Sequence, residues 1–151
     1  MSTNVSTCGE LIFDRTANDA SYARLMQSST QTDLKGAYNA SDLNRVECNC
    51  AYLANYLTSL GYICTIETKT NWTMEDIPWL VEHINRIRYN VIKIVDCFIQ
   101  RPNAPKIIVD GYMDYQKANN LEQCLQLTYD FIDCMIEETP LCDQYYCGEY
   151  Y

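Results

Sequence analysis

Three long stretches repeat apolar residues at the spacing of an α-helix, and this pattern constrains the fold more than any other feature. The apolar positions step by three and four residues, which places them on one helix face. Three such faces are hidden from water when they pack on one another, so the sequence predicts a mainly α-helical chain that forms a three-helix bundle. The apolar positions are Leu43, Val46, Cys50, Leu53, Leu57 and Leu60; then Leu80, Ile84, Ile87, Val91, Ile94 and Phe98; then Leu121, Cys124, Leu125, Thr128, Phe131, Ile132, Met135 and Ile136.

Capping and breaking residues set the expected helix ends. Ser41 is a favourable N-cap for the first helix, and Gly61 is a typical C-terminal stop. The second helix is expected to start near Pro78 and must end before Pro102. The third runs from about 116 to 138.

A short β element is predicted between the first two helices. Residues 62–69 are rich in β-branched side chains and alternate roughly between apolar and polar. They are expected to form a strand, paired either with Leu11–Phe13 or with Lys106–Val109. The result is a small sheet at one end of the bundle, or an open edge that a partner strand completes.

With 151 residues, of which 48% are hydrophobic, the chain fits a single folded domain, 1–151. Residues 1–34 are expected to form an N-terminal arm with the short strand and a weak helix over Asp19–Met26. Residues 35–140 form the bundle, and residues 141–151 form a tyrosine-rich tail.

The charge balance argues against nucleic acid as a partner. There are 20 acidic and 11 basic residues, a net charge of -9, whereas phosphate binding needs clustered Lys and Arg. No apolar stretch is long enough to cross a bilayer, and residues 1–10 lack the pattern of a signal peptide. A membrane is therefore not expected as a partner.

Nine cysteines suggest a metal site or a disulfide framework, but their spacing supports neither. An odd number cannot pair completely within one chain, and no zinc-type spacing occurs, so no metal is predicted. Cys97, Cys124 and Cys134 fall in helical patterns, where cysteine behaves as a small buried apolar residue. Reduced thiols are the expected state, with Cys142 and Cys147 the most reactive because they lie in the tail.

Catalytic chemistry has little support. The single histidine, His83, lies in a helical pattern and is expected at a boundary or the surface. Glu75 and Asp76 precede a helix, where an acid stabilises the helix N-terminus. No phosphate loop, nucleophile elbow or metalloprotease motif occurs. The chain is predicted not to be an enzyme and to need no cofactor.

Thirteen tyrosines are the unusual part of the composition. Aromatic rings with a polar tip are enriched in protein–protein contacts. The tail is expected either to fold back on its own bundle or to dock on a partner, and Trp72 and Trp79 are expected to fill the bundle end. The candidate partner-binding residues are Tyr112, Tyr115, Tyr145, Tyr146, Tyr150 and Tyr151.

Several motifs resemble a domain of uncharacterised tail or baseplate-type structural proteins from tailed bacteriophages and prophages of Gram-positive, often gut, bacteria. The resemblance covers most of the chain. The chain departs from the family pattern in the apolar Trp79–Val81 and in its high cysteine content. The motifs are Leu11-Ile-Phe-Asp-Arg-Thr16, Lys35-Gly-Ala-Tyr-Asn-Ala-Ser-Asp-Leu-Asn-Arg-Val-Glu47, Lys69-Thr-Asn-Trp-Thr-Met-Glu-Asp-Ile-Pro78, Ala118-Asn-Asn-Leu-Glu122 and Gly148-Glu149.

The resemblance implies a non-enzymatic structural protein of the phage virion, in the tail, baseplate or neck. Such a protein is made in the host bacterial cytoplasm and acts in the particle through other phage structural proteins and copies of itself. A receptor- or glycan-binding adhesion module on the same particle is the alternative, because exposed Tyr and Trp rings also stack on sugars. A small intracellular enzyme is a third class that the residues leave open.

Overall fold

The computed structural model describes residues 7–26, 34–97 and 104–138, apart from the side chains at 77–81 and 138. These ranges contain four α-helices and one 3₁₀ helix, which confirms the prediction of a mainly α-helical chain. There are four α-helices rather than the three of the predicted bundle, because the weak helix expected in the N-terminal arm is present as a short helix before it. The elements are α1 (Ala17–Leu25), α2 (Ala40–Ser59), η1 (Met74–Trp79), α3 (Leu80–Asp96) and α4 (Tyr115–Glu138).

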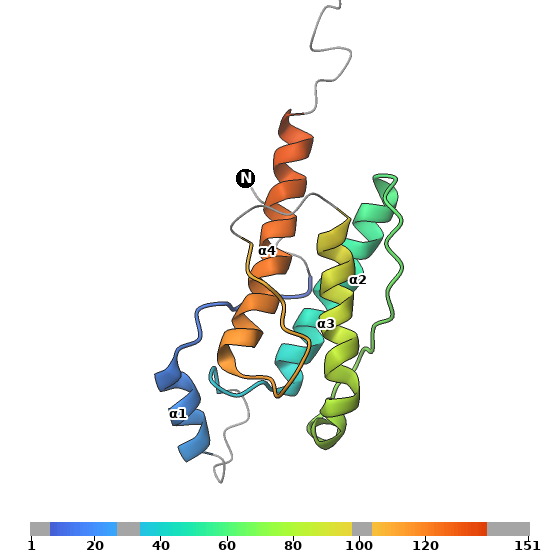
Figure 1. Ribbon diagram of the computed structural model, residues 1–151. Helices are drawn as coiled ribbons and strands as arrows, with labels where there is room; N and C mark the ends of the chain where they lie inside the picture. Colours follow the sequence, from blue (N-terminus) through green and yellow to red (C-terminus); the bar gives the residue numbers. More distant parts are fainter. Residues whose placement is uncertain (1–6, 27–33, 98–103, 139–151) are drawn as a thin grey trace, which may run out of the picture.

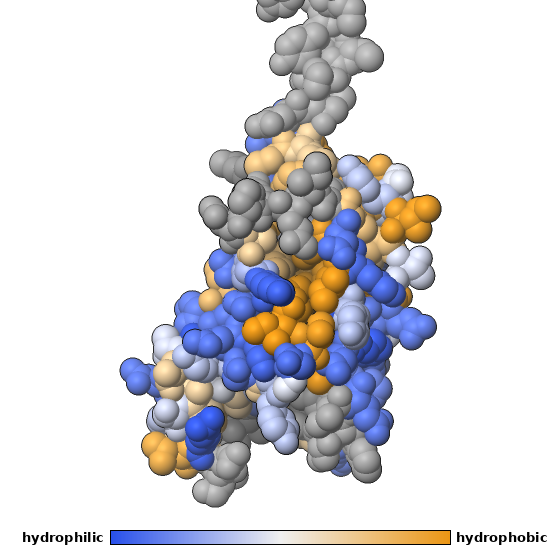
Figure 2. Space-filling model, in the orientation of Figure 1, coloured by the Kyte–Doolittle hydropathy of each residue, from blue (hydrophilic) through white to orange (hydrophobic). Residues whose placement is uncertain are grey.

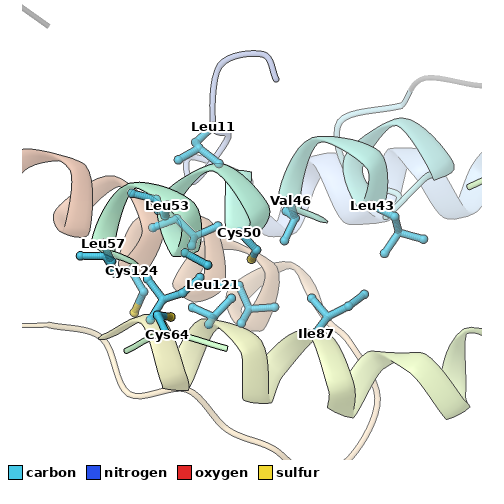
Figure 3. Close-up of a cluster of buried hydrophobic side chains, with 14 of the residues drawn as sticks. Leu11, Leu43, Val46, Cys50, Leu53, Leu57, Cys64, Ile87, Leu121 and Cys124 are labelled. Carbon is cyan, nitrogen blue, oxygen red and sulfur yellow. The ribbon is translucent and has the colours of Figure 1, made fainter. Parts of the chain in front are cut away.

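The three long helices pack on one another, and α1 lies to one side (Figure 1). Figure 3 shows apolar side chains of α2 facing Ile87 of α3 and Leu121 of α4. Leu53, Leu57 and Ile87 are each 0% exposed. Burial of one such side chain contributes about 1.5–3 kcal/mol, so this shared apolar interior is the main source of bundle stability.

The predicted apolar faces are confirmed from Leu43 and Leu121 onward and wrong at the C-terminal ends of α2 and α4. Leu60 is 40% exposed, and Ile136 is 48% exposed. Leu60 follows the last turn of α2, and α4 extends past the ends of α2 and α3 in Figure 1, so no neighbouring helix covers these positions. The side chains of Leu80 and Phe98 lie outside the described ones.

The start of α2 differs from the prediction. Its N-cap is Asn39 rather than Ser41. The side chain of Asp42 reaches back and accepts a hydrogen bond from the Asn39 N–H at 2.9 Å, which satisfies a backbone donor that the helix leaves unpaired. Because Asp42 sits three residues after the cap, its carboxylate is held at a fixed place at the end of the bundle.

The second predicted helix begins as a 3₁₀ helix, η1, which continues directly into α3. Asp76 accepts hydrogen bonds from the Thr73 N–H at 2.8 Å and from the Thr73 hydroxyl at 3.1 Å. The Lys69 ammonium lies 2.9 Å from Asp76, and it lowers the pKa of this carboxyl to about 2. Asp76 thus has the stabilising position at a helix start that the sequence predicts.

Helix α1 is held against the loop before α2 by a close backbone approach. A Cβ atom at Gly36 would lie 1.9 Å from the carbonyl oxygen of Asp19, so only glycine fits here. Thr16 and Asp19 cap the helix reciprocally, because each side chain accepts a hydrogen bond from the other's backbone N–H. The weak helix expected over Asp19–Met26 is therefore present, at Ala17–Leu25.

No strand occurs in the described ranges, so the predicted β element at 62–69 is wrong. The segment keeps a strand-like alternation, with Cys64 buried and Ile63 93% exposed. Its backbone carbonyls bind helix side chains instead of a second strand: Lys93 donates to Thr65 at 3.4 Å, and Asn90 donates to Glu67 at 2.6 Å. These carbonyls are thus satisfied by side chains of α3 rather than by the N–H groups of a second strand.

Neither of the two segments predicted to pair with 62–69 forms a strand. The N–H of Ile12, within Leu11–Phe13, donates to Glu122 of α4 at 2.6 Å. The segment around Lys106–Val109 crosses one face of the bundle in Figure 1. Figure 2, in the same orientation, shows apolar residues gathered in the middle of that face, with hydrophilic residues around them. No described helix has the length and apolar character that a membrane span requires.

Candidate functional site

Four charged side chains meet where the N-terminal arm crosses α2 and α4, and we call them the ionic network: the buried Arg15, Asp42 and Glu122, and the largely buried Arg45. Arg15 Nη2 lies 2.9 Å from Asp42 Oδ1 and 2.8 Å from Glu122 Oε1. Arg45 Nη2 lies 2.9 Å from Glu122 Oε1 and also contacts Asp42, while Arg45 Nε donates to Glu122 Oε2 at 3.0 Å. Two cations thus share two anions.

The network is electrically balanced and almost dry. The side chains of Arg15 and Glu122 are 2% and 0% exposed. Buried charges are tolerated only when each one is paired and hydrogen-bonded, and removal of one partner leaves another charge without compensation. The ionic network therefore fixes the arm against the bundle and forms a rigid base.

Backbone contacts from helix side chains complete this base. Asn119 accepts a hydrogen bond from the Arg15 N–H at 3.1 Å and donates one to the Arg15 carbonyl at 2.9 Å. Arg15 Nε donates to the Lys35 carbonyl at 3.1 Å. The guanidinium also lies 5.6 Å from the ring centre of Tyr38, a cation–π distance. Arg15 is the centre of this region.

The motifs that carry the phage resemblance supply the same residues. The ionic network and Asn119 come from three of them, at 11–16, 35–47 and 118–122. The sequence alone did not reveal these contacts, because they join residues as far apart along the chain as Arg15 and Glu122. In this chain these motif residues build the fold.

A second buried charge lies at the next turns of α2. Glu47, 1% exposed, pairs with both terminal guanidinium nitrogens of Arg86 on α3. It also accepts from the Trp72 indole N–H and the Lys69 backbone N–H, each at 3.3 Å. Asn44 binds the backbone of Trp72 at both its N–H, 2.7 Å, and its carbonyl, 3.0 Å. This second cluster ties the segment after 62–69 to the helices.

Trp72 and His83 lie in contact with each other beside this second cluster. Trp72 is 3% exposed, which confirms its structural role. His83 is half-buried and meets the Trp72 ring edge-on, with the ring centres 5.3 Å apart. This position fits the boundary residue that the sequence predicts. The side chain of Trp79 lies outside the described ones.

A groove opens between α1 and the start of α4, above the ionic network, and we call it the α1–α4 groove. Its hollow is about 340 Å³. Helix α1 contributes Ala20, Ala23 and Arg24, the loop before α2 contributes Gly36 to Tyr38, and the opposite wall runs from Tyr112 to Tyr115. Arg15 and Ala118 complete the lining.

The wall that carries Tyr112 is fixed through its backbone. Lys117 Nζ donates to the carbonyls of Asp110 and Tyr112 at 3.1 and 3.0 Å. Arg88 donates to the Gly111 carbonyl at 3.1 Å from each of its terminal nitrogens. Asp114 caps α4 by accepting from the Lys117 N–H at 2.8 Å. The turn is therefore held in place while the Tyr112 ring stays 88% exposed.

Tyr38 lines the groove and carries an unsatisfied polar group below its surface. Its hydroxyl is buried and has no hydrogen-bond partner among the described residues. Burial, with Glu122 and Asp42 nearby, raises the pKa of Tyr38 well above its ordinary value, so the hydroxyl stays protonated and keeps a proton to donate. Buried polar groups without partners are rare in folded proteins.

The structure brings together two of the six predicted partner-binding residues, Tyr112 and Tyr115, on one wall of the groove. The other four, Tyr145, Tyr146, Tyr150 and Tyr151, lie outside the described residues, so their role stays a prediction. Sequence reasoning missed Arg24 and Tyr38. Tyr38 stands in a motif that carries the resemblance, but no local pattern places it opposite residues 112–115.

The cysteines are partly as predicted. Cys8 and Cys48 form a disulfide, so the expectation of reduced thiols is wrong for this pair. It joins residues 40 positions apart, and closure of a loop of that size is worth about 4 kcal/mol in the chain-entropy model. The described free thiols are Cys50, Cys64, Cys97, Cys124 and Cys134.

Of the three cysteines expected to be buried in helices, Cys124 is buried and Cys97 half-buried. Cys134 is exposed, because it faces away from the apolar side of α4. The part of the chain that the structure describes holds no cluster of three or more His, Cys, Asp or Glu side chains suited to a metal. Cys142 and Cys147 lie outside it.

Thiol labelling distinguishes these environments. Burial raises the pKa of Cys124 to about 11, and that of Cys64, which also contacts Cys97, to about 11. A raised pKa leaves less thiolate at neutral pH, and the thiolate is the reactive form. Among the described free thiols we expect Cys134 to react with iodoacetamide first and Cys50 and Cys124 last, as followed by peptide mass spectrometry. Equal rates for Cys134 and Cys124 would contradict the assigned burial.

The chain was compared with protein-family models, curated proteins and solved structures, and none of them matches. The phage resemblance therefore stays a prediction from the motifs.

Proposed function

We propose that the chain is a non-enzymatic structural protein of a phage virion, in the tail, baseplate or neck, and that it acts through protein–protein assembly. The motif resemblance supports the phage assignment. The α1–α4 groove supports assembly, and the observation that carries the proposal is the exposed ring of Tyr112, next to the half-buried Tyr115, on a fixed backbone.

An exposed aromatic on a fixed backbone is suited to binding. Tyrosine contributes a large apolar face and a polar tip, and such residues are frequent binding hot spots. Because Lys117 and Arg88 already order the turn at residues 110–112, a partner does not have to order it on binding. Preorganisation of this kind increases affinity.

The groove also indicates the chemistry of its partner. A hollow of about 340 Å³ accepts an apolar or aromatic side chain from a neighbouring protein. Arg24 and Asp114 supply one cation and one anion at its wall. We propose that the occupant is a segment of another phage structural protein, with an apolar residue flanked by polar ones.

Substitution of Tyr112 and Tyr115 by alanine tests the proposal. We expect the chain to be a component of purified virions of the phage or prophage that encodes it. The double variant should bind particles that lack the chain at least about thirtyfold more weakly, because an aromatic anchor is worth about 2 kcal/mol or more. Tyr89→Ala is the control, since Tyr89 is 53% exposed on α3 and lies outside the groove.

Three results would argue against this function. Absence of the chain from virions in deep proteomic coverage would contradict a virion role. Equal binding by the double variant and the control would exclude the groove as the docking site. Binding to host cell walls that the double variant loses would identify the receptor- or glycan-binding module instead.

Deletion of residues 143–151 tests the predicted tail anchors separately, with the melting temperature as the measure of folding.

A further inference from the structure

Two free thiols lie against each other where residues 62–69 cross the end of α3, and we call them the thiol pair: Cys64 and Cys97. Cys64 stands in that segment, and Cys97 directly follows the last residue of α3. The side chain of Cys64 is in contact with that of Cys97. Figure 3 shows Cys64 between α2 and α3. The thiol pair therefore bridges the segment and the helix.

Hydrogen bonds hold both members of the pair at this level of the bundle. The Cys97 thiol donates to the carbonyl of Lys93, one turn earlier, at 3.2 Å. The Lys93 ammonium donates in turn to the carbonyl of Thr65, the residue after Cys64, at 3.4 Å. These two bonds place the segment and the last turn of α3 side by side. The two sulfur atoms are therefore brought together by the fold around them.

The two thiols differ in their access to solvent. Cys64 is 8% exposed and belongs to the apolar interior, whereas Cys97 is half-buried and packs against its edge. Burial raises the pKa of Cys64, and the nearby Lys93 ammonium opposes this. A reagent in solution therefore meets Cys97 first, and Cys64 is placed to react with whatever Cys97 has bound.

We propose that Cys64 and Cys97 are a redox-sensitive pair, which a small-molecule disulfide such as oxidised glutathione converts into a second disulfide of the chain. The Cys97 thiolate attacks one sulfur of the reagent, which forms a mixed disulfide and releases one molecule of the reduced thiol. The Cys64 thiolate then attacks Cys97 Sγ and displaces the second molecule. Two protein thiols are oxidised, one reagent disulfide is reduced, and the two thiol protons end on the two released thiols.

The other described free thiols are placed differently. Cys50 is 0% exposed, so a reagent in solution does not reach it. The Cys124 thiol is buried and donates to the Pro105 carbonyl at 3.3 Å. Cys134 is exposed, and it faces away from the apolar side of α4. We therefore expect oxidation to select Cys64 and Cys97.

The new disulfide would replace hydrogen bonds by a covalent link between the segment and α3. It would close a loop that contains η1 and the whole of α3. Such a link stabilises a fold mainly by restricting the unfolded chain, and a loop of this size is expected to raise the melting temperature by about 7–14 °C. A chain that folds with free thiols would thus become more heat-stable in an oxidising environment. The pair lies outside the α1–α4 groove, so this inference is independent of the proposed function.

Incubation of the full chain with oxidised glutathione tests the proposal. After alkylation in denaturant, peptide mass spectrometry should find Cys64 linked to Cys97, and the melting temperature should rise as stated. Cys64→Ser should keep glutathione on Cys97 as a mixed disulfide, because the second sulfur is missing. Cys97→Ser should show neither the link nor the rise. Cys134→Ser is the control, since it removes an exposed thiol and should leave both unchanged; all variants keep Cys8–Cys48.

Three outcomes would overturn the proposal. Glutathione that stays on Cys97 of the unsubstituted chain would show that Cys64 cannot displace it. A link from Cys64 to Cys50, or from either member of the pair to another cysteine, would show that a different pair is selected. A rise in melting temperature that Cys97→Ser retains would show that the stabilisation does not come from this link.

Discussion

Replacement of Glu122 by glutamine is expected to destabilise the chain by about 3–5 kcal/mol, the range for breaking a buried ion pair. Glutamine has nearly the same shape as glutamate, so the lower free energy of unfolding comes from the lost negative charge. Arg15 and Arg45 would then share only Asp42, and a buried positive charge would be left without compensation. Total stabilities of about 5–15 kcal/mol are typical, so this is a large fraction. Urea unfolding followed by circular dichroism measures it.

Glu137→Gln is the matched control, because Glu137 lies on the same helix and is exposed. Exposed charges contribute little, and a change within about 0.5 kcal/mol is expected. If Glu122→Gln and Glu137→Gln unfold at the same urea concentration, the ionic network does not hold the arm as described.

Replacement of Ile132 by aspartate should be equally damaging. Ile132 is 1% exposed in the apolar face of α4, and the new carboxylate would have no partner there. Burial of an unpaired charge is among the costliest single changes, several kcal/mol or more. We expect a strongly lowered melting temperature, or no folded protein.

Ile136→Asp provides the comparison, one turn further along α4. Ile136 is 48% exposed, so its new carboxylate stays in water and the melting temperature should change little. The two variants have the same chemistry and helix and differ in burial. A smaller effect at Ile132 than at Ile136 would show that the register of α4 is wrong.

The helices were predictable because their signal is local. Steps of three and four residues identify the buried faces of α2, α3 and α4 without knowledge of the partner helix. Helix ends were less predictable. Asn39 and Ser41 are both of a residue type that is preferred at an N-cap. The choice of Asn39 depends on Asp42, three residues later, whose side chain binds the Asn39 N–H.

The β element and the groove were not predictable for a different reason. Composition and alternation at 62–69 are those of a strand, and the burial pattern agrees. Whether such a segment pairs depends on what its backbone meets, and it meets Lys93 and Asn90 of a helix whose sequence gives no sign of this. In the same way, only the folded chain places Tyr38 and Arg24 opposite Tyr112.

The way in which the non-helical segments are held has a consequence for sequence divergence. Asn119 and Asn44 each bind a backbone N–H and carbonyl of such a segment, and Glu122 binds a further N–H. A backbone contact does not depend on which side chain the segment carries. Relatives of this chain should therefore retain the asparagines and glutamates on the helices, while residues such as Ile12 on the segments change freely.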